Sequence, residues 1–150
     1  MTETGSRAPD FSLRDQDGNL VSLADLEGQT SVLVFYPLDF SPGCTDQLSI
    51  YQEVLAELEA EGACLYGISV DSAFCHKAFR KQQRLTFPLL ADFEPKGETA
   101  RRYGMYIAER GHNERGFVVI GRDLVVKHIH RSPSALEIPG ANLIFDALIA

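Results

Sequence analysis

The chain of 150 residues contains 45% hydrophobic and 23% charged residues, which is typical of a single globular domain spanning positions 1–150. Its formal charge of -7 repels nucleic acid and anionic lipid, so neither is an expected partner. No stretch approaches the roughly 20 apolar residues of a membrane-spanning helix, and the first residues lack the pattern of a secretion signal. We therefore expect a cytoplasmic protein without a membrane segment.

The first third of the chain predicts a hairpin, a central strand and a helix. Residues 8–13 and 21–23 flank an Asp-Gly turn, which is a hairpin signal. Residues 31–35 form a continuous β-branched run, as expected of a strand covered on both faces. Apolar residues spaced three and four apart then predict a helix over 44–61.

The middle of the chain continues the alternation of strand and helix. Residues 64–70 are apolar and predict a second central strand. Asp71 or Ser72 can cap the helix that follows. A brief strand over 87–90 and a short helix over 96–103 are expected next.

The end of the chain predicts a hairpin and a final helix. Residues 116–120 and 124–130 are apolar runs on either side of a Gly-Arg-Asp turn, and residues 142–148 can dock as a last helix. Alternating helices and strands predict an α/β domain, and the closing hairpin predicts a mixed central sheet flanked by helices.

The three cysteines are Cys44, Cys64 and Cys75. They form no CxxC pair, and their odd number argues against a secreted disulfide framework. Cys64 lies within an apolar strand and is predicted to be a small core residue. Cys75 is expected near the start of a helix.

Cys44 stands where a buried strand has ended and a helix begins. Free backbone N–H groups and the positive end of the helix dipole stabilise an anion there, so the sequence predicts a nucleophilic thiolate. Ser41 offers a hydroxyl three residues earlier, and Pro37 can shield the sulfur from water. Together these residues predict a compact pocket that stabilises charge on a departing oxygen.

The pattern Pro37-x-x-x-Ser41-x-x-Cys44 resembles the active-site signature of the peroxiredoxins. Residues 8–11, 68–72 and 87–92 look like further landmarks in family order, so the resemblance covers almost the whole chain. Within the family, the chain looks most like the alkyl hydroperoxide reductase E type and next like the peroxiredoxin Q, or bacterioferritin comigratory protein, type.

The resemblance implies a thioredoxin-like fold with an N-terminal β-hairpin extension and no cofactor. It implies that Cys44 is the peroxidatic cysteine, which reduces hydrogen peroxide and organic hydroperoxides through a sulfenic acid. It also implies an arginine beside the thiolate, a place that Arg115 fits, although a solvated hairpin arginine is the plain alternative. A thioredoxin- or glutaredoxin-like reductant and a homodimer complete the expectations.

The chain departs from the family pattern at two places. Gln47 stands three residues after the cysteine, where relatives often have Glu, and Ile120-Gly121 ends a strand where relatives often have Asp. Neither change removes a reacting group. These changes leave open which side chains form the hydrogen bonds around the active site.

The thiol that resolves the sulfenic acid is left open by the sequence. Cys75 can resolve it within the chain, although the helix that begins at Cys44 would have to unwind locally to bring the two cysteines within disulfide distance. If Cys75 takes no part, the protein is a one-cysteine peroxidase reduced by an external thiol, as the E type usually is.

The histidines predict no catalytic or metal site. His76 is expected on the surface at a helix start, where it could lower the pKa of Cys75. His128 and His130 alternate on one strand face, but no cysteine or carboxylate cluster stands near them in the sequence.

Two other functions compete with a peroxidase. A disulfide oxidoreductase on the same fold would need a CxxC pair, which is missing. A redox sensor that passes its oxidised state to a partner shares the first chemical step and stays open.

Overall fold

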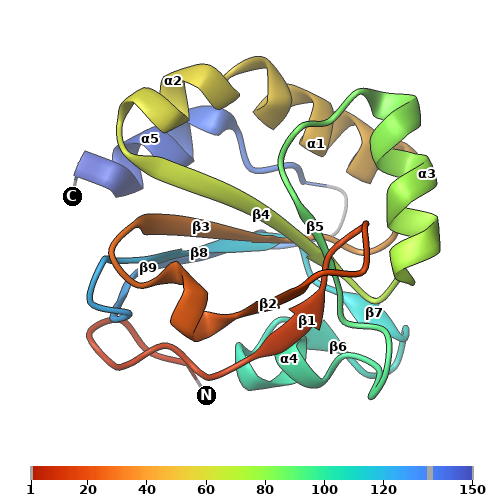
Figure 1. Cartoon of the computed structure of the whole chain (residues 1–150), viewed down its shortest axis with the longest axis horizontal. Helices are drawn as coiled ribbons and strands as arrows, with labels where there is room; N and C mark the ends of the chain where they lie inside the picture. Colours follow the sequence, from red (N-terminus) through yellow and green to blue (C-terminus); the bar gives the residue numbers. More distant parts are fainter. Residues whose placement is uncertain (1, 135–136, 150) are drawn as a thin grey trace.

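The computed structural model describes residues 2–134 and 137–149 (Figure 1). Its main sheet is seven-stranded, with the order β2-β1-β5-β4-β3-β8-β9. The strands of this sheet are β1 (Ser12–Arg14), β2 (Leu20–Ser22), β3 (Thr30–Phe35), β4 (Ala63–Ser69), β5 (Leu89–Ala91), β8 (Gly116–Ile120) and β9 (Val126–Arg131). A separate two-stranded sheet joins β6 (Tyr106–Ile107) and β7 (His112–Asn113).

The sheet is mixed, as the sequence predicted. β3, β4 and β5 run parallel, while β8 pairs antiparallel with β3 and with β9. The predicted N-terminal hairpin is present, because β1 pairs antiparallel with β2 and joins the main sheet through β5. The parallel strands place the loops that follow β3, β4 and β5 at one edge of the sheet.

Helices cover both faces of the sheet (Figure 1). The helices are η1 (Leu23–Leu26), α1 (Pro42–Glu53), α2 (Leu55–Ala60), α3 (Ala73–Gln83), α4 (Glu98–Arg102) and α5 (Ala141–Ile149). Side chains alternate along β3, so Val32 and Val34 belong to a core cluster with residues of α1, α2, α3 and α5. Leu33 and Phe35 belong to a second cluster with residues of η1 and α4. The two clusters form the layers of an α/β domain.

The helix predicted over 44–61 is wrong in its start and in its continuity. It begins at Pro42, because proline suits the first helical position, where no backbone N–H is needed. It is interrupted at Val54, which has φ -107° and ψ 10°, so that α1 and α2 are separate helices. The apolar spacing continues across this break, which is why periodicity alone did not detect it.

Other predicted boundaries moved by a few residues where turn residues intervene. The predicted strand over 124–130 begins only at Val126, because Leu124 adopts a left-handed conformation with φ 64°. The brief strand begins at Leu89 instead of Phe87, since Pro88 has no backbone N–H for the ladder. Neither η1 nor the β6–β7 pair is predicted by the sequence, because these elements are only two to four residues long.

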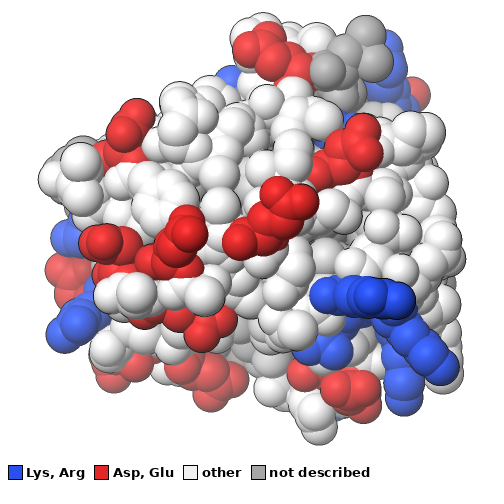
Figure 2. Space-filling model, turned by 90° about the horizontal axis from the view of Figure 1, so that it is seen from above, with Lys and Arg blue, Asp and Glu red and all other residues white. Residues whose placement is uncertain are grey.

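The charged side chains are unevenly distributed over the upper face (Figure 2). Acidic residues are spread across it, while the largest group of basic residues lies at the end where Figure 1 shows α3. The last turn of α3 carries Arg80 and Lys81. Cations at this position stabilise a helix through its dipole. Within the described residues, no helix is long and apolar enough to cross a membrane.

Candidate active site

The loop between β3 and α1 brings Cys44 to the start of a helix, as predicted. Ser41 is the N-cap residue, with φ -70° and ψ 144°, and its carbonyl accepts the first helical bond from the N–H of Thr45 at 2.9 Å. Pro42 follows at the first helical position. Cys44 is therefore the third residue of α1, and its thiol is free and fully buried. Pro37 is also buried, where the chain leaves the sheet.

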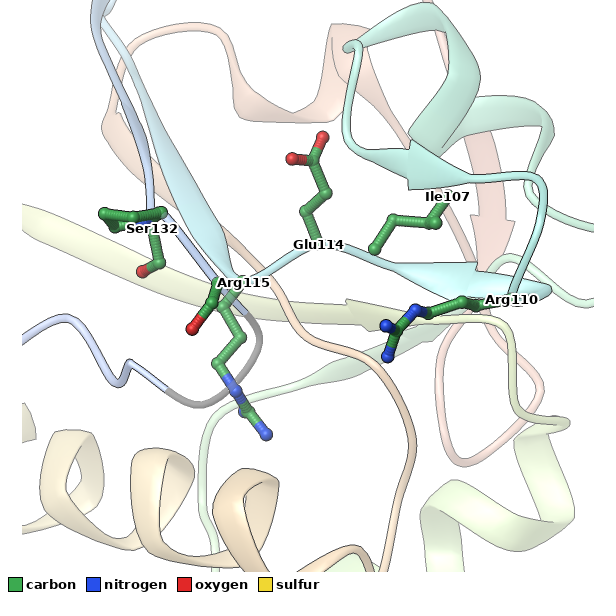
Figure 3. Close-up of a pocket in the computed structure, with 7 residues that line it drawn as sticks. Ile107, Arg110, Glu114, Arg115 and Ser132 are labelled. Carbon is green, nitrogen blue, oxygen red and sulfur yellow. The ribbon is translucent and has the colours of Figure 1, made fainter.

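Arg115 reaches the first turn of α1 from the position just before β8 (Figure 3). It precedes β8, and β8 pairs antiparallel with β3, so that Gly116 lies opposite Phe35. The Nη1 group of Arg115 donates a hydrogen bond of 2.8 Å to Oε1 of Gln47. Arg115 is only 5% exposed, which excludes the alternative of a solvated hairpin arginine.

Gly43 lies directly against this guanidinium. A Cβ atom at Gly43 would stand only 2.5 Å from Nη2 of Arg115. The absence of a side chain therefore lets the guanidinium approach the residue next to Cys44. Gln47, at the position where relatives often have Glu, supplies the hydrogen-bond acceptor on the same helix. The structure thus brings Cys44 and Arg115 to one helix turn.

Ser41 is near Cys44 in the chain, but its hydroxyl is directed elsewhere. Its Oγ donates a hydrogen bond of 3.0 Å to the carbonyl of Leu38. A hydroxyl has one proton to donate. Stabilising charge on a substrate oxygen would therefore require Ser41 to rotate away from Leu38.

A buried polar network that the sequence analysis missed holds the same loop to α3. The hydroxyl of Tyr36 donates a bond of 2.6 Å to Asp39 Oδ1, and Asp39 Oδ2 lies 2.6 Å from Nδ1 of His76. The other ring nitrogen, Nε2, donates to the Leu90 carbonyl at 3.0 Å. Because a carbonyl only accepts, Nε2 of His76 carries one proton. The short approach of Nδ1 to Asp39 Oδ2 requires a second proton between these two atoms.

The prediction of a surface position for His76 is therefore wrong, because its side chain is fully buried. The signal that could have identified the network is Asp39 itself, a charged residue in an otherwise apolar segment after a buried strand. Such a residue needs a partner when it is buried.

Cys75 lies in the first turn of α3. Of the two residues predicted as possible caps of this helix, Asp71 and Ser72, the structure shows Ser72 in that role. The backbone N–H of Cys75 donates to Ser72 Oγ at 3.1 Å, and its thiol donates to Asp71 Oδ1 at 3.8 Å. Partial burial, and then the negative charges of Asp39 and Asp71, raise the pKa of Cys75 to about 12. The expectation that His76 could lower the pKa of Cys75 is therefore wrong.

Asp39, Asp71 and Cys75 bring possible metal-ligand atoms within 4.8 Å of one another. Their oxygens already have partners, since Asp71 Oδ2 accepts from the Asp39 N–H at 2.7 Å and from Ser69 Oγ at 2.6 Å. The raised pKa keeps the Cys75 thiol protonated, and a thiol binds metal as the thiolate. We interpret the cluster as a structural network that ties two loops together.

Cys64 and the strand histidines are separate from this site. Cys64 is half-buried at the start of β4, where its thiol donates to Gln29 Oε1 at 3.1 Å. It is about 17 Å from the edge that carries the candidate site, given a rise of about 3.3 Å for each residue along the strand. His128 and His130 stack on the ring of Phe117.

A comparison with protein families matches residues 4–129 to the AhpC/TSA family. Alkyl hydroperoxide reductase E of Mycobacterium tuberculosis is 36% identical over 151 residues, covering 100% of this chain and 98% of the relative. A chloroplastic peroxiredoxin Q of Triticum aestivum is 48% identical over 88 residues, covering 59% of this chain and 41% of the relative. Both resemblances noted from the sequence are confirmed.

Solved structures confirm the predicted thioredoxin-like peroxiredoxin fold. Peroxidoxin BcpB of Mycobacterium tuberculosis matches with a TM-score of 0.88 and 28% identity, covering 99% of this chain and 97% of the other. AhpC of Enterococcus faecalis matches with a TM-score of 0.91 and 26% identity, covering 99% and 92%. The chain therefore belongs to the AhpC/TSA family of peroxiredoxins and is a thiol-dependent peroxidase.

Proposed function

We propose that Cys44 is the peroxidatic nucleophile of this enzyme and that Arg115 stabilises it. The observation that carries the proposal is the contact of the Arg115 guanidinium with Gly43, held by the bond to Gln47. A fixed cation beside a helix start favours a thiolate and stabilises negative charge on a peroxide oxygen. Pro37 would keep water from the sulfur, and Ser41 would turn its hydroxyl towards the substrate.

In the first step, the Cys44 thiolate attacks the terminal oxygen of a hydroperoxide. The S–O bond forms as the O–O bond breaks, and the departing alkoxide or hydroxide takes up a proton. The sulfur is thereby oxidised to a sulfenic acid while the peroxide is reduced to an alcohol or water. A second thiol then displaces water from the sulfenic acid to form a disulfide, which an external thiol reduces.

The physiological reductant and the location are parts of the proposal that rest on the family. A thioredoxin- or glutaredoxin-like donor would reduce the oxidised enzyme. The mycobacterial relative fits a cytoplasmic location, while other relatives are described as chloroplastic. Both therefore stay predictions.

Replacing the nucleophile tests the proposed function. The Cys44→Ser variant should consume no hydrogen peroxide, because a serine hydroxyl is not ionised at neutral pH and is a far weaker nucleophile. Cys64→Ser is the matched control, since Cys64 lies near the opposite edge of the sheet, and it should consume one equivalent as the wild type does. Peroxide consumption by the reduced proteins gives the answer, and consumption by Cys44→Ser at the wild-type rate would reject the assignment.

Crowding the guanidinium tests the role of Arg115. A Cβ atom in Gly43→Ala would meet Nη2 of Arg115, the mobile end of a side chain, so the fold should persist while the guanidinium moves. We expect the rate of Cys44 oxidation to fall about 100-fold, the lower end of the range of about 100- to 1000-fold for loss of a positioned donor, because the guanidinium is displaced and not removed. Stopped-flow or quenched assays measure the rate, and circular dichroism checks the fold. An unchanged rate would show that Arg115 need not lie at Gly43.

We propose Cys75 as the resolving cysteine, with an external thiol as the alternative. Its pKa of about 12 keeps it protonated in the folded state, so the thiolate fraction should increase about tenfold for each pH unit between 7 and 9. After one equivalent of peroxide, intact mass spectrometry should find a loss of two hydrogens in the wild type but not in Cys75→Ser. That loss should appear faster at higher pH. A sulfenic or sulfinic acid retained by the wild type would instead favour the external thiol.

We propose a homodimer formed through the sheet edge that carries the site. Large apolar side chains are exposed on the segments that follow β3, β4 and β5: Leu38 (39%), Phe40 (45%), Phe74 (88%) and Phe93 (55%). Exposed apolar groups gathered at one edge favour association. Sedimentation should therefore detect a dimer that Phe74→Glu dissociates. Ile149→Glu, at an exposed site on α5, should leave it intact, and a monomeric wild type would contradict the proposal.

A further inference from the structure

The exposed surface of α3 is basic, although the chain as a whole is acidic. Residues 72–86 contain four Lys or Arg residues and no Asp or Glu, while the whole chain has a formal charge of -7. On the upper face, the largest basic group lies at the end where Figure 1 shows α3 (Figure 2). The four cations, which we call the α3 basic face, are Lys77, Arg80, Lys81 and Arg84.

The α3 basic face borders a cavity of about 370 Å³. The other wall is the turn between β1 and β2, where Gln16 and Asp17 lie. Asp17 is the one acidic residue of this lining among the described residues, and its Oδ1 lies 3.8 Å from Nζ of Lys77. Exposed ion pairs of this length are weak. Most of the positive charge around the cavity is therefore uncompensated.

The cations of the α3 basic face are accessible to a partner. The Lys77 side chain is 69% exposed, and Lys81 and Arg84 are exposed as well. Arg80 is half-buried, and its guanidinium donates to the carbonyls of residues 86 and 87 at 2.8 and 3.0 Å. The helix and these carbonyls thus hold a group of cations at fixed positions on the surface.

Helix stability explains only part of the α3 basic face. Cations in the last turn, here Arg80 and Lys81, interact favourably with the helix dipole. Lys77 lies in the second turn, where the dipole has little effect. Like charges three and four residues apart on a helix repel each other, as Lys77 does with both Arg80 and Lys81. A partner with negative charge would remove this repulsion.

The same helix carries the proposed resolving cysteine. Given a rise of about 1.5 Å for each residue, Lys81 lies about 9 Å and Arg84 about 14 Å along the helix from Cys75. A typical protein interface covers about 800 Å² on each partner, which is a disc of about 16 Å radius. Phe74 belongs to the proposed dimer interface at the start of the helix, which leaves the basic end open. A protein docked there would reach Cys75.

The rest of the upper face repels an acidic protein. Carboxylates are spread across it (Figure 2). Glu57 and Glu59 are exposed on α2, which packs on the same face of the sheet as α3. An acidic partner would therefore be repelled from α2 and attracted to α3. Charge would fix its orientation as well as increase its rate of encounter.

We propose that the α3 basic face docks the protein that reduces this enzyme, a thioredoxin-like dithiol with an acidic surface. The inference rests on the proposed function, since the docked protein acts on the Cys44–Cys75 disulfide. A partner thiolate attacks one sulfur of that disulfide, and the other sulfur leaves as a thiolate and takes up a proton. The second partner thiol loses its proton and attacks the mixed disulfide, so the partner leaves oxidised and the enzyme regains both thiols.

The docking can be tested by comparing two reductants on the oxidised enzyme. One is a bacterial thioredoxin with a net negative charge, and the other is dithiothreitol, which is uncharged and has no surface to dock. Lys77→Gln/Lys81→Gln should lower the rate constant for the thioredoxin about tenfold in low salt, because charge steering is lost. The rate constant for dithiothreitol should not change. In about 1 M salt, which screens charges beyond about 3 Å, the wild type and the variant should react equally fast with the thioredoxin.

Arg122→Gln/Lys127→Gln is the matched control. It removes the same two charges from exposed positions before and within β9, which is the far edge strand of the sheet. This variant should react with the thioredoxin nearly as fast as the wild type. An equal fall in the control would overturn the proposal, because net charge and not the α3 basic face would then be responsible. An unchanged rate in Lys77→Gln/Lys81→Gln would also overturn it.

A binding measurement separates this inference from the proposed function. When the thioredoxin is titrated into isotope-labelled Cys44→Ser in low salt, the amide NMR signals of residues 77–84 should shift. Adding Lys77→Gln/Lys81→Gln to this background should weaken the binding. A short DNA duplex is the competing anionic probe, and tighter binding of the duplex than of the thioredoxin to these residues would overturn the proposal.

The two proposals fail in different ways. If the thioredoxin shifts the signals of residues 77–84 but the wild type consumes no peroxide, the proposed function fails and the docking surface stands. If the wild type consumes peroxide but the thioredoxin shifts none of these signals, the docking surface fails alone.

Discussion

The register between β3 and β8 is the constraint on which the candidate active site depends. Phe35 lies opposite Gly116, so the next residue of one strand and the preceding residue of the other leave the sheet together. Arg115 is thereby fixed at the level of the loop that leads to Cys44. A shift of one residue would turn its side chain to the other face of the sheet, where it could not reach Gln47. A backbone pairing therefore sets the position of the charge that we propose to stabilise the Cys44 thiolate.

Parallel pairing provides the second constraint, because it collects three loops at one edge. The loops after β3 and β4 supply Asp39 and Asp71, and the N–H of Asp39 donates to Asp71 Oδ2. His76 of α3 joins Asp39 to the carbonyl of Leu90 in β5. Buried charged groups carry a large desolvation penalty, and removing one partner typically costs about 3–5 kcal/mol. This network therefore resists any rearrangement that separates the Cys44 loop from α3. Local unfolding for disulfide formation would have to occur mainly within α1.

The two cysteines of the proposed cycle lie in opposite electrostatic surroundings. Cys44 has a guanidinium and helix N–H groups near it, which favour an anion. Cys75 has two carboxylates near it, which disfavour one and keep its thiol protonated. This contrast favours a division of roles in which Cys44 alone reacts with peroxide, because the thiolate is the reactive form of cysteine. The second cysteine would act only after α1 has unwound locally and brought Cys44 to it.

The sequence by itself determined the fold class, the position of Cys44 at a helix start and the family to which the chain belongs. These features depend on local patterns, which a single sequence shows directly. The patterns are the periodicity of strands and helices, the Asp-Gly turn and the spacing of Pro37, Ser41 and Cys44. Element boundaries were less certain, because Val54 and Leu124 interrupt their elements without any special residue type.

Only the tertiary structure decided how distant residues meet. The contact of Arg115 with Gly43 and the burial of His76 against Asp39 each join segments that the chain order separates. Such contacts depend on strand order and register, which arise from packing the whole core and which no short segment encodes.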